Sequence, residues 1–320
     1  MSRNLTIAET AAWLMKRDNF LIITHRRPDG DTLGSAGALA QALGEMGKTA
    51  YILPNPETTP RYAHFVENYP APGGYTPAEV IAVDTASPEL FPANAHGLED
   101  CISLSIDHHP SNTGYALNSC IDETYASCGE VIFDLLIAMT GGISGKSAEC
   151  LYAAISTDTG CFAFSNTTAN THRVAAALID YGAPHKMLNR LLFRTKTLGR
   201  MKIEGMIYSG LEFYFGGAVA ISLITRDMME SANAGEDDVD DIASIPGSVE
   251  GVLAGITIRE LTSKTDCKVS VRTGQEVNAH SICARFGGGG HRMAAGFTRN
   301  ATVGEIKHDL LEALEQELGI

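Results

Sequence analysis

The stretch Cys101-Ile-Ser-Leu-Ser-Ile-Asp-His-His109 decides how this chain is organised, because an apolar run ends here on a carboxylate and two imidazoles. A second apolar run, Phe20–Thr24, is followed by His25-Arg-Arg-Pro-Asp-Gly-Asp31. Short apolar runs are typical of buried parallel strands, whose carboxyl ends meet at one sheet edge where ligands bind. Aspartate and histidine gathered at such an edge suit two divalent cations. A paired-metal site in turn implies hydrolysis of phosphate esters or anhydrides.

The first half of the chain alternates short apolar runs with helical patterns. We expect parallel strands at Phe20–Thr24, Thr49–Leu53, Val80–Val83 and Ile102–Ile106. We expect helices at Thr32–Met46, Ser127–Met139 and Ser147–Ser156. This alternation predicts an α/β fold in which helices cover a parallel sheet.

The pattern changes around Pro184–Gly210, where the helix-prone segment Leu188–Tyr208 could connect two domains. Beyond it we expect strands at Phe213–Ile224, Val252–Glu260 and Lys268–Arg272, and a closing helix at Val303–Leu318. The acidic stretch Gly235–Asp241 is expected to be a solvated loop or helix start. The predicted organisation is a domain at residues 1–186, a connector at 187–211 and a smaller α/β domain at 212–320, with a cleft between the domains.

Composition narrows the class of protein. The formal net charge of −14 argues against binding of long duplex nucleic acid, which needs a broad basic face. It leaves short nucleotides open, because bound cations would reverse the local sign of ligand carboxylates. No stretch approaches the roughly 20 apolar residues that span a bilayer, and Met1–Thr6 has no apolar signal core, so we expect a cytosolic protein without a membrane partner. The seven cysteines are scattered without a Cys-x-x-Cys pair, which supports neither a zinc ribbon nor a disulfide framework.

Two further segments end in a carboxylate. Asp84 closes the apolar run in Ala82-Val-Asp-Thr85, and Asp158 follows a predicted helix in Ser156-Thr-Asp-Thr-Gly160. Singly, such an aspartate is more often a helix cap or turn former than a ligand. The combination favours ligands, because several of these carboxylates lie among apolar residues where an unpaired charge is costly, and coordination by two cations removes that cost.

Taken in order, four segments resemble the four motifs of the DHH phosphoesterases: His25–Ser35, Val83–Thr85, Ile106–His109 and Thr157–Gly160. A fifth, Phe286-Gly-Gly-Gly-Gly-His-Arg-Met-Ala-Ala-Gly296, is similar to the glycine motif of the DHH-associated substrate domain. The resemblance covers nearly the whole chain. It predicts a DHH catalytic domain followed by a DHH-associated domain.

The resemblance implies two cation sites that share one carboxylate, Asp84. The ligands would be His25, Asp29 and Asp84 for one cation, and Asp31, Asp84, His108 and Asp158 for the other. Manganese is the usual ion of the family, with magnesium the second choice, and oxygen-rich sites with imidazole suit Mn²⁺. The two cations would share a water, lower its pKa and so activate it for attack on phosphorus.

Beyond the cation ligands, the catalytic residues are expected to include His109, Asp84 and Asp107. The resemblance places His109 near the phosphate, where it would stabilise charge or protonate the leaving oxygen. Asp107 is expected to orient a ligand histidine. Arg26 and Arg27 lie inside the first motif, and the sequence gives them no role.

The second domain is expected to bind the substrate. Its phosphate site would use Gly288, Gly289, Gly290 and His291, since glycines let backbone N–H groups point at an anion. Arg272 and Arg285 would add bidentate contacts to phosphate oxygens. A clamp that grips one end of the substrate while chemistry occurs a nucleotide away favours short substrates.

The function implied is hydrolysis of very short RNAs or linear dinucleotides to mononucleotides, together with removal of the 3′-phosphate of 3′-phosphoadenosine 5′-phosphate. The sequence does not separate these substrates. Homodimerisation is seen in relatives and has no support of its own in the sequence.

Four other functions are alternatives. Cyclic dinucleotide hydrolases often add membrane and sensory segments that this sequence does not show, while an enzyme that acts on their linear products stays open. Manganese-dependent inorganic pyrophosphatases share the metal motifs but carry Ser-Arg-Lys-Lys-Gln where this chain has the glycine run ending at His291. A processive single-strand exonuclease needs further domains and aromatic platforms in a basic channel, which one Trp and the charge of −14 do not supply. An inactive nucleotide sensor predicts a lost ligand, whereas every ligand position here holds a competent residue.

Overall fold

The computed structural model describes residues 3–239 and 242–319, and the chain divides into two compact units, Met1–Thr195 and Lys196–Ile320. The division falls inside the connecting segment 187–211 expected from the sequence. Asp240 and Asp241, the end of the predicted acidic loop, lie outside the described residues, and Glu236–Val239 before them form a 3₁₀ turn. Among the described residues, no helix combines the length and apolar character needed to cross a bilayer.

The first unit contains a six-stranded sheet in which every neighbouring pair is parallel, so the α/β fold class is confirmed. The strand order is β1 (Arg3–Asn4), β6 (Asn118–Ile121), β5 (Ile102–Asp107), β4 (Glu79–Val83), β2 (Phe20–Ile23) and β3 (Ala50–Ile52). The four predicted strands form within one or two residues of their expected bounds. The short edge strand β1 and strand β6 were not predicted.

The described part of this unit also contains six α-helices. They are α1 (Ile7–Met15), α2 (Gly30–Glu45), α3 (Cys128–Thr140), α4 (Gly145–Asp158), α5 (Ala169–Asp180) and α6 (His185–Asn189). Asp29, Ser127 and Ser144 cap the starts of α2, α3 and α4 by accepting hydrogen bonds from backbone N–H groups. The three helices expected here are therefore confirmed, and α1 and α5 are additional.

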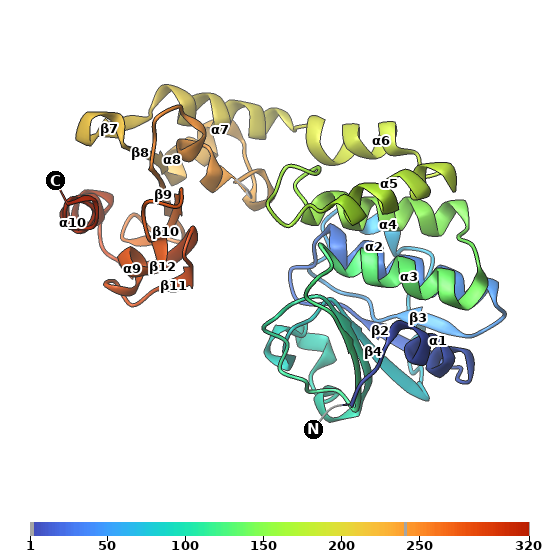
Figure 1. The fold of residues 1–320 in the computed structure, drawn as a ribbon. Coiled ribbons are helices and arrows are strands. Elements are labelled where there is room, and N and C mark those ends of the chain that lie inside the picture. The colour runs from blue at the N-terminus through green and yellow to red at the C-terminus, as the bar shows by residue number, and fades with distance from the viewer. Residues whose placement is uncertain (1–2, 240–241, 320) are drawn as a thin grey trace. The chain divides into compact units, whose positions relative to one another are not determined.

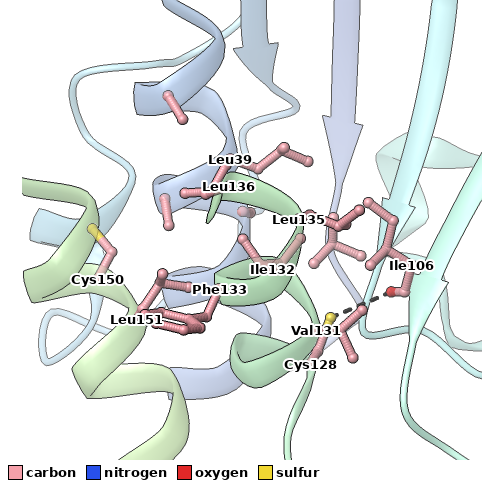
Figure 2. Close-up of a cluster of buried hydrophobic side chains, with 14 of the residues drawn as sticks. Leu39, Ile106, Cys128, Val131, Ile132, Phe133, Leu135, Leu136, Cys150 and Leu151 are labelled. Atoms are coloured by element: carbon pink, nitrogen blue, oxygen red, sulfur yellow. Dashed lines mark hydrogen bonds between the residues drawn. The ribbon is translucent and has the colours of Figure 1, made fainter. Parts of the chain in front are cut away.

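Helices cover one face of this sheet, and α2, α3 and α4 pack against one another there (Figure 1). Figure 2 shows buried side chains that these helices contribute to one hydrophobic cluster, Leu39 of α2, Leu135 and Leu136 of α3 and Leu151 of α4, which also includes Ile106 of β5. The opposite face packs against the irregular segments that flank β5, through Phe91 and Ala95 before this strand and Ala116 after it. Three short 3₁₀ turns lie between β4 and β5, at Pro88–Leu90, Ala93–Ala95 and Glu99–Cys101, and another precedes β4 at Ala63–Phe65.

The second unit has a mixed six-stranded sheet. Its order is β11 (Gly289–His291), β12 (Ala294–Asn300), β10 (Asp266–Thr273), β9 (Ala254–Glu260), β8 (Val219–Ile224) and β7 (Glu212–Tyr214), and only β8 and β9 pair in parallel. The helices are α7 (Leu198–Ser209), α8 (Arg226–Ala232), α9 (Ala279–Ala284) and α10 (Val303–Leu318). Side chains of α9 and α10 share one core with the sheet, and α10 has the predicted bounds. Short 3₁₀ turns lie at Phe215–Gly217, Ile242–Ser244 and Pro246–Ser248.

Two sequence expectations were wrong in this region. The helix-prone segment Leu188–Tyr208 is not one helix, because α6 widens into a π-helical turn at Arg190–Arg194 and stops. Thr197 then caps a new helix, α7, by accepting a hydrogen bond from the N–H of Arg200. The strand expected at Phe213–Ile224 is two strands, since Phe215, Gly216 and Gly217 take positive φ and turn the chain between β7 and β8.

The close packing of α2 on α4 depends on glycine. A Cβ at Gly34 would lie 2.4 Å from the carbonyl oxygen of Cys150, whereas a Cβ at Gly44 of the same helix would meet nothing within 4 Å. We predict that Gly34→Ala destabilises the protein by about 1–3 kcal/mol because α2 and α4 must separate. Gly44→Ala is the matched control and should stabilise by about 0.5–1 kcal/mol through helix propensity alone. Urea denaturation followed by circular dichroism measures both, and equal effects would contradict the packing argument.

Candidate metal centre

The centre forms where three adjacent parallel strands end. Strands β2, β4 and β5 are neighbours in the sheet, and the residues at or just after their carboxyl ends are His25, Asp84 and Asp107-His108-His109. Helices add the remaining carboxylates: Asp29 and Asp31 at the start of α2, and Asp158 at the end of α4. The topology therefore brings together all six side chains proposed as cation ligands, at the edge where open α/β sheets bind ligands.

One group consists of His25, Asp29 and Asp84, each of which places a nitrogen or oxygen within 4.8 Å of the others. The Nε2 of His25 lies 3.7 Å from Oδ1 of Asp29 and 3.8 Å from Oδ2 of Asp84. These separations are shorter than twice a metal–ligand bond of about 2.1 Å, so one cation could contact all three side chains.

A second group consists of Asp31, His108 and Asp158. The Nε2 of His108 lies 3.8 Å from Oδ2 of Asp31 and 3.7 Å from Oδ2 of Asp158. It also lies 3.6 Å from Oδ1 of Asp84. Asp84 thus presents one carboxylate oxygen to each group, which is the arrangement of a bridging ligand. That these residues bind cations stays a prediction.

The two imidazoles are oriented for coordination through Nε2. Nδ1 of His25 donates to the carbonyl of Arg26 at 2.8 Å, and Nδ1 of His108 lies 3.3 Å from the carbonyl of Tyr125. A carbonyl can only accept, so each ring carries its proton on Nδ1 and has a lone pair on Nε2. A hydrogen bond from the second ring nitrogen to a carbonyl is the usual support of a ligand histidine.

Two buried atoms at the centre of this arrangement have no hydrogen-bond partner: Oδ1 of Asp84 and Nε2 of His108. Asp84 is only 3% exposed, and its backbone φ of 53° lies in the left-handed region that side chains other than glycine rarely adopt. Unpartnered buried polar atoms and backbone strain both cost free energy and are retained at functional sites. The residues present therefore fit a pair of cations, which would satisfy both atoms.

The electrostatics lead to the same conclusion. Burial, together with the nearby charges of Asp158 and Asp29, raises the pKa of Asp31 well above its ordinary value. Burial and the charge of Asp31 do the same to the pKa of Asp84, and burial lowers the pKa of His108. Burial and mutual repulsion thus oppose the ionisation of Asp31 and Asp84, bound cations would favour it, and a neutral imidazole is the form that binds metal.

Asp31 is fixed by the start of α3. Its Oδ2 accepts the N–H of Cys128 at 2.7 Å, and its Oδ1 accepts the N–H of Gly129 at 2.9 Å and the hydroxyl of Ser35 at 3.1 Å. The thiol of Cys128 donates to the carbonyl of Ile106 at 3.4 Å, which ties α3 to the end of β5 (Figure 2). Sequence reasoning missed these donors; the cap at Ser127 was the available signal, since helix N-termini attract anions.

Asp107 and His109 form a separate pair beside the two groups. Nδ1 of His109 donates to Oδ1 of Asp107 at 2.7 Å and lies 3.5 Å from Oδ1 of Asp84. That oxygen of Asp107 also accepts the N–H groups of His108 and His109, and Oδ2 accepts Asn112 at 2.6 Å. The hydrogen bond that His109 donates to Asp107 raises the pKa of His109. His109 therefore has no lone pair on Nδ1 for a cation, and Asn112 is a positioning residue that the sequence did not reveal.

Asp158 is held by a neighbouring loop. The side-chain amide of Asn166 lies 3.4 Å from Oδ2 of Asp158 and donates to the Asp158 carbonyl at 3.2 Å and to the Ala126 carbonyl at 2.9 Å. Arg26 and Arg27 are exposed beside the first group, and Nε of Arg27 lies 3.9 Å from a carboxylate oxygen of Glu57. Within the described residues, neither arginine side chain contacts the proposed ligands; only the backbone carbonyl of Arg26 does, through its hydrogen bond from His25.

In the second unit, the glycine run forms the edge strand β11, and close approach explains two of its glycines. A Cβ at Gly288 would lie 2.3 Å from the carbonyl oxygen of Gly296, and Gly290 has a φ of 138° with the Ala294 oxygen 2.6 Å from a Cβ. Gly289 and His291 are exposed. A pocket of about 680 Å³ is lined by Gln275, His291, Arg292, Met293 and Ala294.

The two arginines expected to bind phosphate differ. Arg272 lies at the end of β10, opposite Ala294 of β12, and its guanidinium donates to the neighbouring Val271 carbonyl at 3.1 Å. Arg285 is turned to α10, where it donates to Gln316 at 2.7 Å and lies 3.9 Å from Glu317. One strand, β12, separates Arg272 from the glycine strand β11, while Arg285 already has a carboxylate neighbour.

The chain is similar to known proteins in both sequence and fold. Residues 19–155 match the model of the DHH family N-terminal domain, and residues 216–319 match the DHHA1 domain. A bifunctional oligoribonuclease and PAP phosphatase NrnA of Thermus thermophilus is 33% identical over 305 residues, which cover 93% of this chain and 89% of that protein.

Solved structures add likeness of fold. An exopolyphosphatase-related protein from Bacteroides fragilis has a TM-score of 0.86 at 22% identity, covering 98% of this chain and 96% of that one. An exonuclease RecJ bound to manganese has a TM-score of 0.52 at 13% identity, covering 98% of this chain and 94% of that one. At these identities the likeness concerns the fold alone.

Cation binding should depend on pH in a defined window. Burial and the charge of Asp29 raise the pKa of Asp158 to about 6, from an ordinary value of 3.8. Below this pH the carboxyl must lose a proton to bind, so we predict that Mn²⁺ affinity falls by up to about tenfold per pH unit through this group. Without cations the sign reverses: a raised carboxyl pKa stabilises the folded state at low pH, and that stability is lost as the pH rises toward 6.

Isothermal titration calorimetry at about pH 7 and about pH 5 checks the affinity. Thermal unfolding with a chelator checks the stability of the cation-free protein. Asp158→Asn is the control and should flatten both profiles in this window. An Mn²⁺ affinity that does not change between the two pH values would contradict the assignment of Asp158 as a ligand.

Proposed function

The chain belongs to the DHH family, and from that membership we propose that it is a metal-dependent phosphoesterase that hydrolyses short oligoribonucleotides or linear dinucleotides to mononucleotides. We also propose that it removes the 3′-phosphate of 3′-phosphoadenosine 5′-phosphate. The names of its relative from Thermus thermophilus cover both activities. The first unit would carry the chemistry and the second would bind the substrate.

The observation that carries this proposal is the position of Asp84. Its two oxygens face two separate groups of carboxylate and imidazole, at 3.8 Å from Nε2 of His25 and 3.6 Å from Nε2 of His108. Paired sites bridged by one carboxylate are typical of enzymes that hydrolyse phosphate esters. Manganese is the ion we propose, because mixed oxygen and imidazole ligands suit it.

Two cations held by these residues would lower the pKa of a shared water and neutralise charge on the phosphoryl oxygens. The chain itself would supply the proton for the leaving group. The hydrogen bond that His109 donates to Asp107 fixes the ring of His109 and favours its protonated form, and 43% of the His109 side chain remains exposed to an entering substrate. The Nε2–H of His109 would protonate the departing oxygen, while Asp107 keeps the ring oriented.

The second unit would bind a phosphate that is not the one cleaved. Arg272 lies on β10, and His291 and the N–H of Gly289 lie on β11, with β12 between these two strands. The guanidinium of Arg272 donates to the carbonyl of its neighbour Val271 and pairs with no carboxylate among the described residues, so it would be available for a bidentate contact to phosphate. We also propose that the protein is cytosolic. All seven cysteines are free thiols, and thiols stay reduced in the cytosol.

The test compares hydrolysis of 5′-phosphorylated diadenylate, a five-nucleotide RNA, 3′-phosphoadenosine 5′-phosphate and inorganic pyrophosphate by the purified full chain with Mn²⁺. We expect turnover of the diadenylate or the 3′-phosphate compound, and its loss in Asp84→Asn, which keeps the size of the side chain. Turnover of pyrophosphate alone would instead make the protein a pyrophosphatase. Binding of nucleotides without any hydrolysis would make it a sensor.

His109 can be tested apart from the ligands. We predict that His109→Ala lowers kcat by about 10²- to 10⁴-fold, the usual contribution of general acid catalysis, while Mn²⁺ affinity stays within about twofold. Steady-state kinetics and calorimetry measure the two quantities. His96→Ala, which changes an exposed histidine outside the centre, is the matched control and should leave both unchanged. Unchanged turnover in His109→Ala, or loss of Mn²⁺ binding, would show that the role given to His109 is wrong.

A further inference from the structure

Phe164 is an exposed aromatic residue six positions after the proposed ligand Asp158, with 60% of its surface accessible. Single exposed apolar residues are common and carry no meaning by themselves. Three features of the surrounding loop set this one apart: its strained backbone, the way its two phenylalanines are divided between the core and the surface, and its attachment to Asp158.

The backbone of the loop is strained where it leaves α4. Gly160, Cys161 and Phe162 have φ values of 56°, 57° and 67°, so two residues other than glycine occupy the left-handed region in succession. Hydrogen bonds hold them there: the N–H of Cys161 donates to the Ser156 carbonyl at 2.7 Å, and the N–H of Phe162 donates to the Thr159 hydroxyl at 3.2 Å. Strain retained in this way is concentrated at functional positions.

The side chains of the two phenylalanines in this loop lie in different surroundings, one against the core and one at the surface. The Phe162 ring packs against Tyr152 with centroids 6.0 Å apart and stacks on His172 at 5.4 Å, and so anchors the loop to the core. The Phe164 ring lies over Gly160, where a Cβ would come within 2.4 Å of the ring. Phe164 is thus an exposed ring laid on a glycine, with its backbone N–H bonded to the Thr159 carbonyl at 3.0 Å.

The loop is also bound to the metal centre. Gly160, beneath the ring, lies two residues after Asp158, so the two Cα atoms are at most about 7.6 Å apart. Two residues after Phe164, the side-chain amide of Asn166 donates to the Asp158 carbonyl at 3.2 Å. The loop that displays Phe164 therefore begins directly after Asp158, and its residue Asn166 is hydrogen-bonded back to Asp158, which is proposed to bind a cation.

We propose that Phe164 is a stacking platform for the base next to the reacting phosphate. In a nucleotide the base is one sugar away from its phosphate, so a phosphate at the metal centre would carry a base to the surface beside it. An aromatic face stacks on any base, which would let the enzyme accept short RNA of any sequence while rejecting phosphates that carry no base. The inference rests on the proposed function and deepens it.

The experiment measures KM and kcat for 5′-phosphorylated diadenylate and for two analogues, each lacking the base at one position. We expect Phe164→Ala to raise KM for the diadenylate about 5- to 150-fold, the usual effect of losing one stacked base. For one of the two analogues the substitution should change nothing, because the stacked base is already absent. Phe164→Trp should retain wild-type KM. Leu117→Ala, an exposed residue before β6 and so at the opposite end of the strands, is the control.

A second readout separates this inference from the proposed function. Fluorescence of a dinucleotide containing 2-aminopurine, which stacking quenches, should fall on binding to the wild type and not to Phe164→Ala. Quenching without hydrolysis would overturn the proposed function and leave the platform standing. The platform is overturned if Phe164→Ala leaves KM and quenching unchanged, if it weakens both analogues as much as the diadenylate, or if it lowers Mn²⁺ affinity, which would make Phe164 a structural support of Asp158.

Discussion

The Asp84 carboxylate is the constraint on which the rest of this structure depends. It is buried at the end of β4 and faces an imidazole and further carboxylates on both sides. One of its oxygens has no hydrogen-bond partner among the described residues. Burial of so many acidic groups within a few ångströms is unfavourable unless cations neutralise them. The chain therefore gives up stability at this edge of the sheet, and the left-handed backbone at Asp84 adds to that cost.

Close packing of helices holds the carboxylates of this centre in place. Asp31 and Asp158 come from α2 and α4, and those helices meet closely enough that a Cβ at Gly34 would touch a backbone oxygen. The start of α3 supplies two N–H donors that fix Asp31. Packing of three helices on one sheet face thus sets the positions of carboxylates that would otherwise repel one another.

Supporting polar contacts divide the site into parts with different tasks. His25 and His108 direct Nδ1 at carbonyls and leave Nε2 for a cation, whereas His109 directs Nδ1 at Asp107. The same residue type therefore has two environments, and the acceptor beside each ring decides which nitrogen faces the centre. The loop that carries Phe164 adds an aromatic surface next to Asp158. The proposed cation ligand and the proposed stacking surface for a base therefore lie on one short segment.

From the sequence alone one can predict the parallel sheet, the helices α2, α3, α4 and α10, and the set of Asp and His residues at the proposed metal centre. Short apolar runs, capping residues and acidic motifs are local signals, and each can be recognised without knowing the fold. The sequence did not determine the two-residue strand β1, the break between α6 and α7, or the division of Phe213–Ile224 into two strands, because short pairings and turns depend on what packs against them.

Tertiary packing alone sets which oxygen of Asp84 faces which imidazole, and which groups hold Asp31, Asp107 and Asp158 in place. The cap at Ser127 indicates N–H donors at the start of α3 but not which carboxylate accepts them, and the amides of Asn112 and Asn166 carry no sequence signature, since asparagine is common in loops. Their roles arise from contacts between segments far apart in the chain or turned toward one another by a loop, and such contacts exist only once the chain is packed.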